Sequence, residues 1–255
     1  MTDFHVIIPA RYHSTRLPAK AIQLIGELPM IVHVCHRAAD SGAKSVTVAT
    51  DNETIKNIVE KAGFSAVMTR DDHPSGSDRL FEAAEIIGLD DNDNIVNVQG
   101  DEPFIPPINI SRVAALLDET QSPMATLCCE IQSAEEALDP NAVKVVFSVT
   151  NKALYFSRSL LPFNRNHEVK QSEQLHSRHY RHIGIYAYKK KFLKQFINWS
   201  PSYLETTESL EQLRVLENGY QIGIDCLPSA PPHGVDTPED LAAARNYFNQ
   251  LKGKA

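Results

Sequence analysis

Residues 4–20 read FHVIIPARYHSTRLPAK, an apolar run that passes directly into a basic segment with two prolines. The β-branched run predicts a buried strand over residues 4–8. The segment after it carries three cations and no acid, namely Arg11, Arg16 and Lys20. Ligands of open α/β sheets bind beyond the carboxyl ends of the strands, so this order predicts a phosphate-binding site there. A solvated basic loop without a ligand is the alternative.

Short apolar runs alternate with amphipathic segments in the first half of the chain, as in a parallel sheet with crossover helices. Further strands are predicted at 45–49, 64–68 and 94–98, and helices at 30–39, 53–62 and 78–87. After about residue 124, strands are predicted with little helix between them, at 124–131, 143–148, 153–159 and 181–188, before helices at 207–218 and 238–251. We therefore expect an α/β fold, a mostly parallel mixed sheet with an antiparallel extension, in a single domain over residues 1–255.

Composition excludes several classes of protein. The 255 residues include 25 basic and 32 acidic side chains, and the net charge of −7 repels nucleic acid and anionic membranes. We expect neither as a partner. The four cysteines form no CxxC pair, and no apolar run is long enough for a signal peptide or a membrane span. These features predict reduced thiols and a cytoplasmic location.

The first turn also lacks two common nucleotide-binding motifs. Neither GxxxxGK nor GxGxxG follows the first strand. A Walker-type ATPase and a dinucleotide-binding dehydrogenase are therefore both disfavoured.

Two aspartates far apart in the chain are candidate metal ligands. Asp101 follows the strand predicted at 94–98, and Asp236 lies in GVDTPED at 234–240. Magnesium prefers one or two carboxylates together with phosphate oxygens and water. A turn-forming role for Asp101 and helix initiation around Asp236 are the alternatives. The metal interpretation requires the two carboxylates to be close in space.

Other polar residues give weaker signals. His176, His179 and His182 have an HxxHxxH spacing, but on a strand His179 and His182 face opposite ways, so a zinc site is a minor interpretation. By helical spacing alone, Glu211 and Gln212 are solvated helix residues.

Seven motifs, taken together, resemble one family. They are IPARYHSTRLPAK (8–20), MTRDDHPSGSDR (68–79), NVQGDEP (97–103), NAVKVV (141–146) with ALYFSRS (153–159), RHIGIYAY (181–188), LETTESLEQLR (204–214) and GVDTPEDL (234–241). In this order, over essentially the whole chain, they resemble the 3-deoxy-manno-octulosonate cytidylyltransferases, the CMP-Kdo synthetases of Gram-negative bacteria.

The resemblance implies a three-layer nucleotide-diphospho-sugar transferase fold, a homodimer and the Mg²⁺-dependent reaction CTP + Kdo → CMP-Kdo + pyrophosphate, which feeds lipopolysaccharide synthesis. It implies that residues 1–123 mainly bind nucleotide and that 124–255 mainly bind the sugar acid and dimerise. Alternatives are a related acceptor, such as an 8-amino-Kdo analogue, a nonulosonic acid or a sugar phosphate, and a nucleotide-binding regulator without turnover.

The resemblance also implies roles for individual residues. Catalytic roles fall on Arg11, Lys20, Asp101 and Asp236, of which the two aspartates are the metal ligands. The nucleotide is assigned to Arg11, Arg16, Lys20, Arg70, Ser75, Gly76 and Arg79. The sugar acid is assigned to Gln99, Arg158, His182, Tyr186, Glu211 and Gln212.

Two positions depart from the family pattern. Ala19 replaces a glycine of the usual RLPGK, so a positive φ costs more here. Ser77 replaces a threonine and keeps the hydroxyl.

Overall fold

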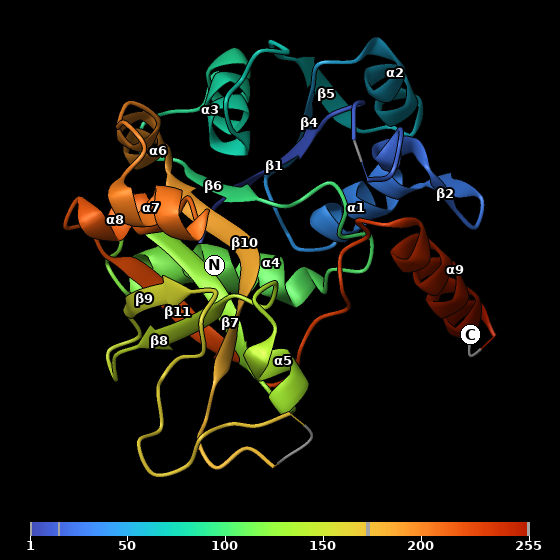
Figure 1. Cartoon of the computed structure of the whole chain (residues 1–255). Coiled ribbons are helices and arrows are strands. Elements are labelled where there is room, and N and C mark those ends of the chain that lie inside the picture. The colour runs from blue at the N-terminus through green and yellow to red at the C-terminus, as the bar shows by residue number, and fades with distance from the viewer. Residues whose placement is uncertain (1, 15, 172–173, 254–255) are drawn as a thin grey trace. The chain divides into compact units, whose positions relative to one another are not determined.

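A computed structural model describes residues 2–14, 16–171 and 174–253 (Figure 1). Its contacts divide the chain into two compact units. The first contains residues 3–112 and, from the C-terminal segment, residues 231–253. The second contains residues 113–230 together with Thr2.

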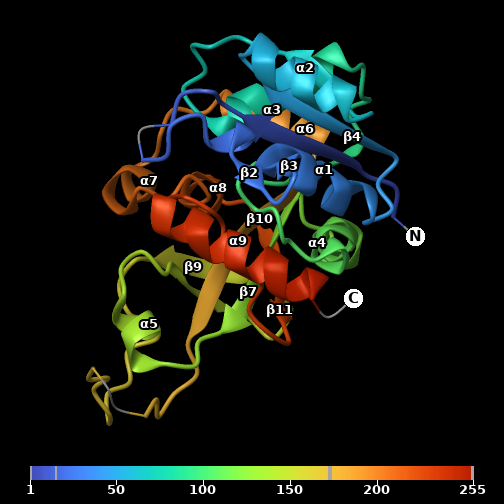
Figure 2. The same ribbon diagram turned by 90° about the vertical axis from the view of Figure 1, so that its right-hand side faces the viewer.

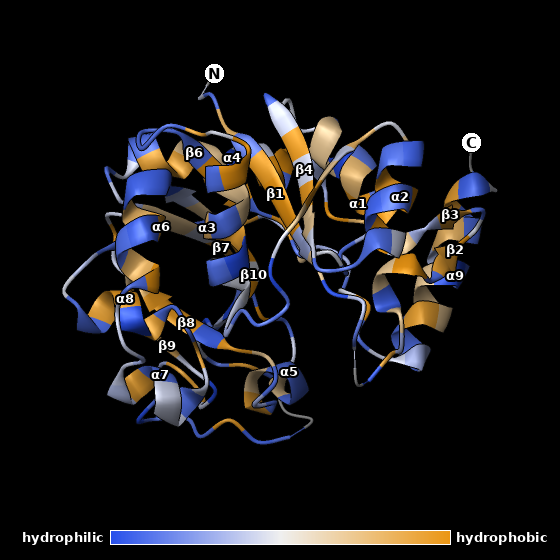
Figure 3. Ribbon diagram, turned by 90° about the horizontal axis from the view of Figure 1, so that it is seen from above, coloured by the Kyte–Doolittle hydropathy of each residue, from blue (hydrophilic) through white to orange (hydrophobic). Residues whose placement is uncertain are grey.

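The first unit is built on four parallel strands in the order β6 (Asn94–Asn97), β1 (His5–Ala10), β4 (Ser45–Thr50) and β5 (Ser65–Met68). The first strand is buried, as predicted: Val6, Ile7 and Ile8 have no exposed surface. Figure 3 shows β1 as an apolar strand. The connecting helices are α1 (Met30–Ala39), α2 (Glu53–Lys61) and α3 (Gly76–Ile86). These strands and helices confirm the parallel α/β pattern predicted from the sequence.

Local capping explains where the helices begin. The Asn52 side chain accepts hydrogen bonds from the amides of Thr54 and Ile55 at the start of α2. Helix α9 (Pro238–Lys252) begins with a capping box between Thr237 and Asp240, as its sequence predicts.

A small apolar cluster ties the C-terminal segment of the first unit to its basic loop. Helix α9 lies beside the short hairpin of β2 (Leu24–Ile25) and β3 (Leu28–Pro29), which follows the single turn η1 (Lys20–Ile22) (Figure 2). The cluster consists of Leu17, Ile25, Met30, Phe104, Val235, Leu241 and Ala244. Leu17 and Val235 are direct neighbours of Arg16 and Asp236, so burying this cluster brings two predicted site segments together.

The second unit contains the antiparallel strands. Strand β10 (Tyr180–Lys189) pairs antiparallel with β7 (Met124–Glu130) and with β8 (Lys144–Phe147), and β8 pairs antiparallel with β9 (Ala153–Ser157). Strand β11 (Ile222–Leu227) lies parallel to β7. Helices α5 (Ala134–Leu138) and α6 (Lys190–Ile197) belong to this unit, and α4 (Pro107–Glu119) carries the chain into it. The antiparallel extension is confirmed, whereas strand β11 and the helices α4, α5 and α6 were not predicted.

One predicted helix is wrong. Residues 207–218 do not form a single helix: 207–208 end α7 (Tyr203–Glu208), 213–217 form α8 (Leu213–Glu217), and 209–212 between them belong to neither. Ser209 between them is in the left-handed region, with φ 53°, which stops α7. No helix among the described residues has the length and apolar character needed to cross a membrane.

Candidate active site

The basic loop leaves the carboxyl end of β1 and ends in a tight turn. Ala19 adopts a left-handed conformation, with φ 51° and ψ 38°, and its carbonyl accepts a hydrogen bond from the amide of Ile22. Lys20 is the first residue of the turn η1. The family glycine is therefore replaced by alanine at a position that still uses a positive φ.

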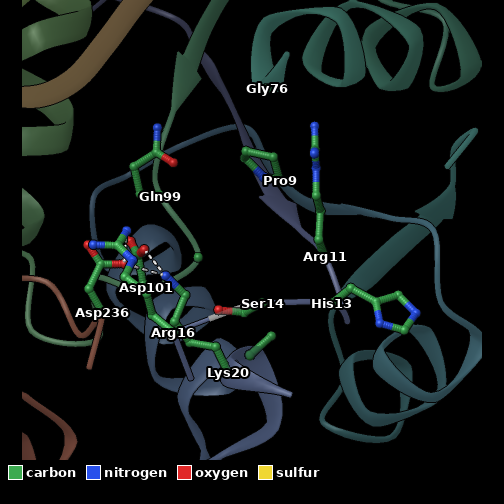
Figure 4. Close-up of a pocket in the computed structure, with 12 residues that line it drawn as sticks. Pro9, Arg11, His13, Ser14, Arg16, Lys20, Gly76, Gln99, Asp101 and Asp236 are labelled. Atoms are coloured by element: carbon green, nitrogen blue, oxygen red, sulfur yellow. Dashed lines mark hydrogen bonds and ion pairs between the residues drawn. The ribbon is translucent and has the colours of Figure 1, made fainter. Parts of the chain in front are cut away.

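The ammonium of Lys20 is shared by the two predicted metal ligands. Its Nζ donates to Asp101 Oδ2 at 2.5 Å and to Asp236 Oδ1 at 2.8 Å (Figure 4). Arg16 Nη2 lies 3.2 Å from the same oxygen of Asp236. Burial opposes the charged form of Lys20, but the two carboxylates outweigh it and raise the pKa of the ammonium. The expectation that the two aspartates meet beside the early cations is confirmed.

Backbone contacts explain why these distant segments meet. The amide of Val235 donates to the carbonyl oxygen of Asp101 at 2.8 Å, directly beside Asp236. Gly100 permits the close approach of the end of β1, since a Cβ there would lie 3.0 Å from the carbonyl oxygen of Pro9. Packing of Val235 into the apolar cluster completes the arrangement.

These groups line a pocket of about 380 Å³ beyond the ends of β1 and β6. Its lining residues are Pro9, Arg11, His13, Ser14, Arg16, Lys20, Ala21, Gly76, Gln99, Gly100, Asp101 and Asp236. Figure 4 shows Arg11 apart from the ion-paired group, extended toward Gly76. The pocket therefore offers an Arg11 guanidinium on one side and a cluster of two cations and two acids on the other, which suits a ligand carrying several phosphates.

Three residues assigned to the nucleotide are not among the lining residues. Arg79 is fully buried and donates to Thr69 Oγ1 and Asp51 Oδ2, each at 2.7 Å. Ser75 caps α3 by accepting a hydrogen bond from the amide of Asp78. Arg70 is exposed and pairs with Asp72 at 2.8 Å. In this structure Arg79 and Ser75 support the start of α3, whose first residue, Gly76, lines the pocket.

In the second unit, Arg158 is held by backbone oxygens. Its Nε donates to the carbonyl of Glu208 at 2.7 Å, Nη1 to that of Pro140 at 3.1 Å and Nη2 to that of Ser209 at 3.4 Å. A guanidinium has five N–H groups, so these three bonds to described residues leave two for a bound carboxylate. Arg158 thus anchors the segment at Ser209 that separates α7 from α8.

Glu208 is a polar residue that the sequence interpretation missed. Its carboxylate accepts hydrogen bonds from the Ser157 hydroxyl at 2.6 Å and from the Arg158 amide at 2.9 Å. Burial opposes ionisation, but these bonds outweigh it and lower the pKa of Glu208. Its position in the LETTESLEQLR motif was the only available signal.

His182 and Tyr186 lie beside each other on β10, with ring centroids 5.3 Å apart. Burial lowers the pKa of His182 to about 3 and raises that of Tyr186 well above its ordinary value, so both rings are neutral at physiological pH. Glu211 also raises the pKa of Tyr186, although less than burial does, and Gln212 is buried at the start of α8. Gln99, the remaining residue assigned to the sugar acid, belongs to the first unit and lines its pocket.

The three histidines of the HxxHxxH spacing have separate partners. His176 stacks on His167, His179 is hydrogen-bonded to Ser177 Oγ and to the Leu161 carbonyl, and His182 contacts Thr126. Within residues 2–14, 16–171 and 174–253, no three or more His, Cys, Asp or Glu side chains form a group that could hold a metal ion. The three histidines therefore have different surroundings and do not form one site.

Comparison with known proteins assigns the chain to a family. A family model described as cytidylyltransferase matches residues 5–222. The chain belongs to the cytidylyltransferase family. It is therefore a nucleotidyltransferase, and the resemblance found in its motifs is confirmed.

Relatives with high identity cover nearly the whole chain. Proteins named 3-deoxy-manno-octulosonate cytidylyltransferase from Pseudoalteromonas translucida (strain TAC 125) and Serratia proteamaculans (strain 568) are 48% and 49% identical to this cytidylyltransferase. In each case the alignment covers 96% of this chain and 98% of the relative.

Two solved structures are also similar to this chain over nearly its whole length. A CMP:2-keto-3-deoxy-manno-octonic acid synthetase in complex with CTP is 41% identical, with a TM-score of 0.89 over 98% of this chain and 99% of the other. A putative glucose-1-phosphate thymidylyltransferase from Bacillus anthracis, in complex with sucrose, is 18% identical, with a TM-score of 0.65 over 96% of this chain and 95% of the other. The second likeness shows the fold alone, and both agree with the α/β class predicted from the sequence.

Proposed function

We propose that this cytidylyltransferase catalyses CTP + Kdo → CMP-Kdo + pyrophosphate in a Mg²⁺-dependent reaction and so activates the sugar acid for lipopolysaccharide synthesis. The observation that carries the proposal is the convergence of Lys20, Asp101 and Asp236 in a pocket that also contains Arg11 and Arg16. The names of the relatives support the same donor and acceptor.

The residues of the pocket suit the chemistry of nucleotidyl transfer. CTP and a sugar acid are both anions, so bringing a sugar hydroxyl to the α-phosphorus requires charge neutralisation. Arg11, Arg16 and Lys20 supply positive charge along the triphosphate. They orient it and stabilise the charge that moves onto the leaving pyrophosphate. Roles for Arg70, Ser75, Gly76 and Arg79 on the nucleotide side remain part of the proposal.

The donor set fits a magnesium ion. Asp101 and Asp236 offer carboxylate oxygens to one place, and that place already accepts a positive charge, the ammonium of Lys20. Hard oxygen ligands of this kind, completed by phosphate and water, are what Mg²⁺ prefers. Asp101 and Asp236 would hold the ion, which when bound polarises phosphate oxygens and lowers the pKa of a nearby hydroxyl.

The acceptor side of the proposal uses neutral polar groups and one cation. Gln99, Arg158, His182, Tyr186, Glu211 and Gln212 are each proposed to bind the sugar acid. The two remaining N–H groups of Arg158 suit a single carboxylate, and neutral His182 and Tyr186 suit hydroxyls. A cytidylyltransferase for an 8-amino-Kdo analogue or a nonulosonic acid is the second candidate, since those acids share the carboxylate and hydroxyls.

We also propose a homodimer and a cytoplasmic location. Light scattering would give twice the chain mass if the dimer forms. All four cysteines of the chain are free thiols in the structure, which suits a reducing compartment.

Pyrophosphate release, measured over a panel of nucleotides and sugar acids with and without Mg²⁺, tests the function. We expect release only with CTP, a Kdo-type acid and Mg²⁺ together. Preference for an 8-amino or nonulosonic acid would select the second candidate. Tight CTP binding with no release for any acceptor would contradict both and identify a nucleotide-binding regulator.

A further inference from the structure

Thr126 lies opposite an irregularity in the strand that carries His182. Along β7 and β10, Ile183 pairs with Leu127, but the next pair is Tyr186 with Thr126. Gly184 and Ile185 therefore have no partner of their own on β7, and β10 bulges between the two pairs. Thr126 is completely buried at this bulge.

The Thr126 hydroxyl has three polar neighbours. Its Oγ1 lies 2.8 Å from the Ile185 carbonyl oxygen, 3.1 Å from that of Ile183 and 2.9 Å from His182 Nε2. The two carbonyl oxygens belong to the bulge itself. The hydroxyl therefore connects the irregular backbone to the His182 ring.

Proton counting fixes the roles of these groups. A hydroxyl has one hydrogen to donate, and carbonyl oxygens only accept. If Thr126 donated to His182, two carbonyl oxygens would face hydroxyl lone pairs at 2.8 and 3.1 Å without a hydrogen between them. Donation to one carbonyl of the bulge removes one of these two conflicts and leaves an Oγ1 lone pair for His182 Nε2–H.

The other ring nitrogen is then an acceptor. In a neutral imidazole only one nitrogen carries hydrogen, so protonated Nε2 leaves Nδ1 with a lone pair. Burial lowers the pKa of His182 and keeps the ring neutral. Among the described residues no hydrogen bond to Nδ1 is found, and Phe156 and Tyr186 pack around the ring at 5.0 and 5.3 Å between centroids.

We propose that Thr126 is a positioning residue that holds His182 as its Nε2–H tautomer, so that Nδ1 accepts a hydrogen bond from a hydroxyl of the sugar acid. This inference rests on the proposed function, which assigns His182 to the acceptor. It adds which nitrogen of His182 accepts from a hydroxyl of the acid and which residue fixes that tautomer. A carboxylate beside Nδ1 would place two lone pairs against each other, which disfavours it there.

Three variants test the inference. Thr126→Val keeps the shape and removes the hydroxyl, Thr126→Ser restores the hydroxyl, and Thr150→Val is a matched control at an exposed turn. Two-bond ¹⁵N–¹H spectra report the tautomer of His182, whose signal is assigned by its loss in His182→Gln. Steady-state kinetics give KM for the sugar acid and for CTP separately, and thermal melting checks folding.

We expect the Nε2–H tautomer in the wild type, in Thr126→Ser and in Thr150→Val. Thr126→Val should raise the sugar-acid KM about 10-fold, the cost of one lost hydrogen bond of ordinary strength, with CTP KM changed less than about 2-fold. Thr126→Ser should restore the sugar-acid KM.

An Nδ1–H tautomer in the wild type would overturn the inference, as would a folded Thr126→Val with unchanged sugar-acid KM. If Thr126→Val does not fold, the wild-type spectrum together with the kinetics of Thr126→Ser decides. A wild-type enzyme without turnover on any sugar acid would refute the proposed function, while the tautomer measurement would still stand by itself.

Discussion

Lys20 is the residue around which the candidate site of the first unit is arranged. Its ammonium pairs with both Asp101 and Asp236, and removing it would leave two carboxylates facing each other. The same ammonium is proposed to contact the triphosphate. We expect a nucleotide that arrives with its own cation to let Lys20 exchange its contacts with the aspartates for contacts with phosphate. The cation would then pair with the two acids.

A substitution at Ala19, beside Lys20, is expected to stabilise the protein. A left-handed conformation strains any residue with a Cβ, and Ala19 has φ 51°. We expect Ala19→Gly to raise the free energy of unfolding by roughly 0.5–1 kcal/mol, after allowing for the extra chain entropy of glycine. Urea unfolding measures this. The control Ala62→Gly, at φ −81°, should give no gain. A loss of stability in Ala19→Gly would mean that the turn is not strained.

The buried His182 is expected to make the folded protein less stable at acid pH. Burial lowers its pKa from 6.5 to about 3, so below about pH 6.5 the unfolded chain binds a proton that the folded protein does not. His182 therefore lowers the free energy of unfolding progressively as the pH falls from about 6.5 towards 3. Replacing it by glutamine, which does not titrate, should make the melting temperature fall less steeply over that range. The exposed His167→Gln is the control, and parallel curves for His182→Gln and wild type would contradict the prediction.

At the scale of elements, local signals predicted the regular parts of the fold. Helix α1 has the predicted bounds, and the strands of the first unit match to within two residues at each end, because apolar runs and helix-ending glycines are local features. The break between α7 and α8 was not predictable in this way. It depends on Arg158, some 50 residues away in sequence, whose side chain binds the carbonyls of Glu208 and Ser209.

Arg158 is therefore expected to act on both stability and substrate. Arg158→Ala removes three hydrogen bonds to carbonyl oxygens and should lower the free energy of unfolding by about 1–3 kcal/mol. It should also raise KM for the sugar acid more than KM for CTP. Chemical unfolding and steady-state kinetics separate the two effects.

The control is Arg178→Ala, whose side chain is 77% exposed and should be neutral in both assays. An Arg158→Ala enzyme with wild-type stability would refute the anchoring role. Unchanged sugar-acid KM would refute the substrate role.

At the scale of the whole molecule, the chain combines residues separated by 81 and 216 positions in one ion-paired group. The sequence predicted that Asp101 and the basic loop share one edge of the sheet, because both follow parallel strands. For Asp236 the sequence stated only that a metal site requires it to be close to Asp101. Its position depends on the packing of Val235 and on the backbone hydrogen bond from Val235 to Asp101. Roles for the sugar-acid residues came from resemblance alone.

Pyrophosphate release from CTP and Kdo, measured as a function of Mg²⁺ concentration, tests whether Asp101 and Asp236 hold a catalytic metal ion. The measurement compares wild type with Asp101→Asn, Asp236→Asn and the exposed control Asp91→Asn. We expect wild type and the control to require Mg²⁺, and each site variant to lose at least about 100-fold in kcat/KM while keeping its circular dichroism spectrum. Near-normal turnover in either site variant, or full wild-type activity after chelation of divalent ions, would contradict the metal assignment of the two aspartates.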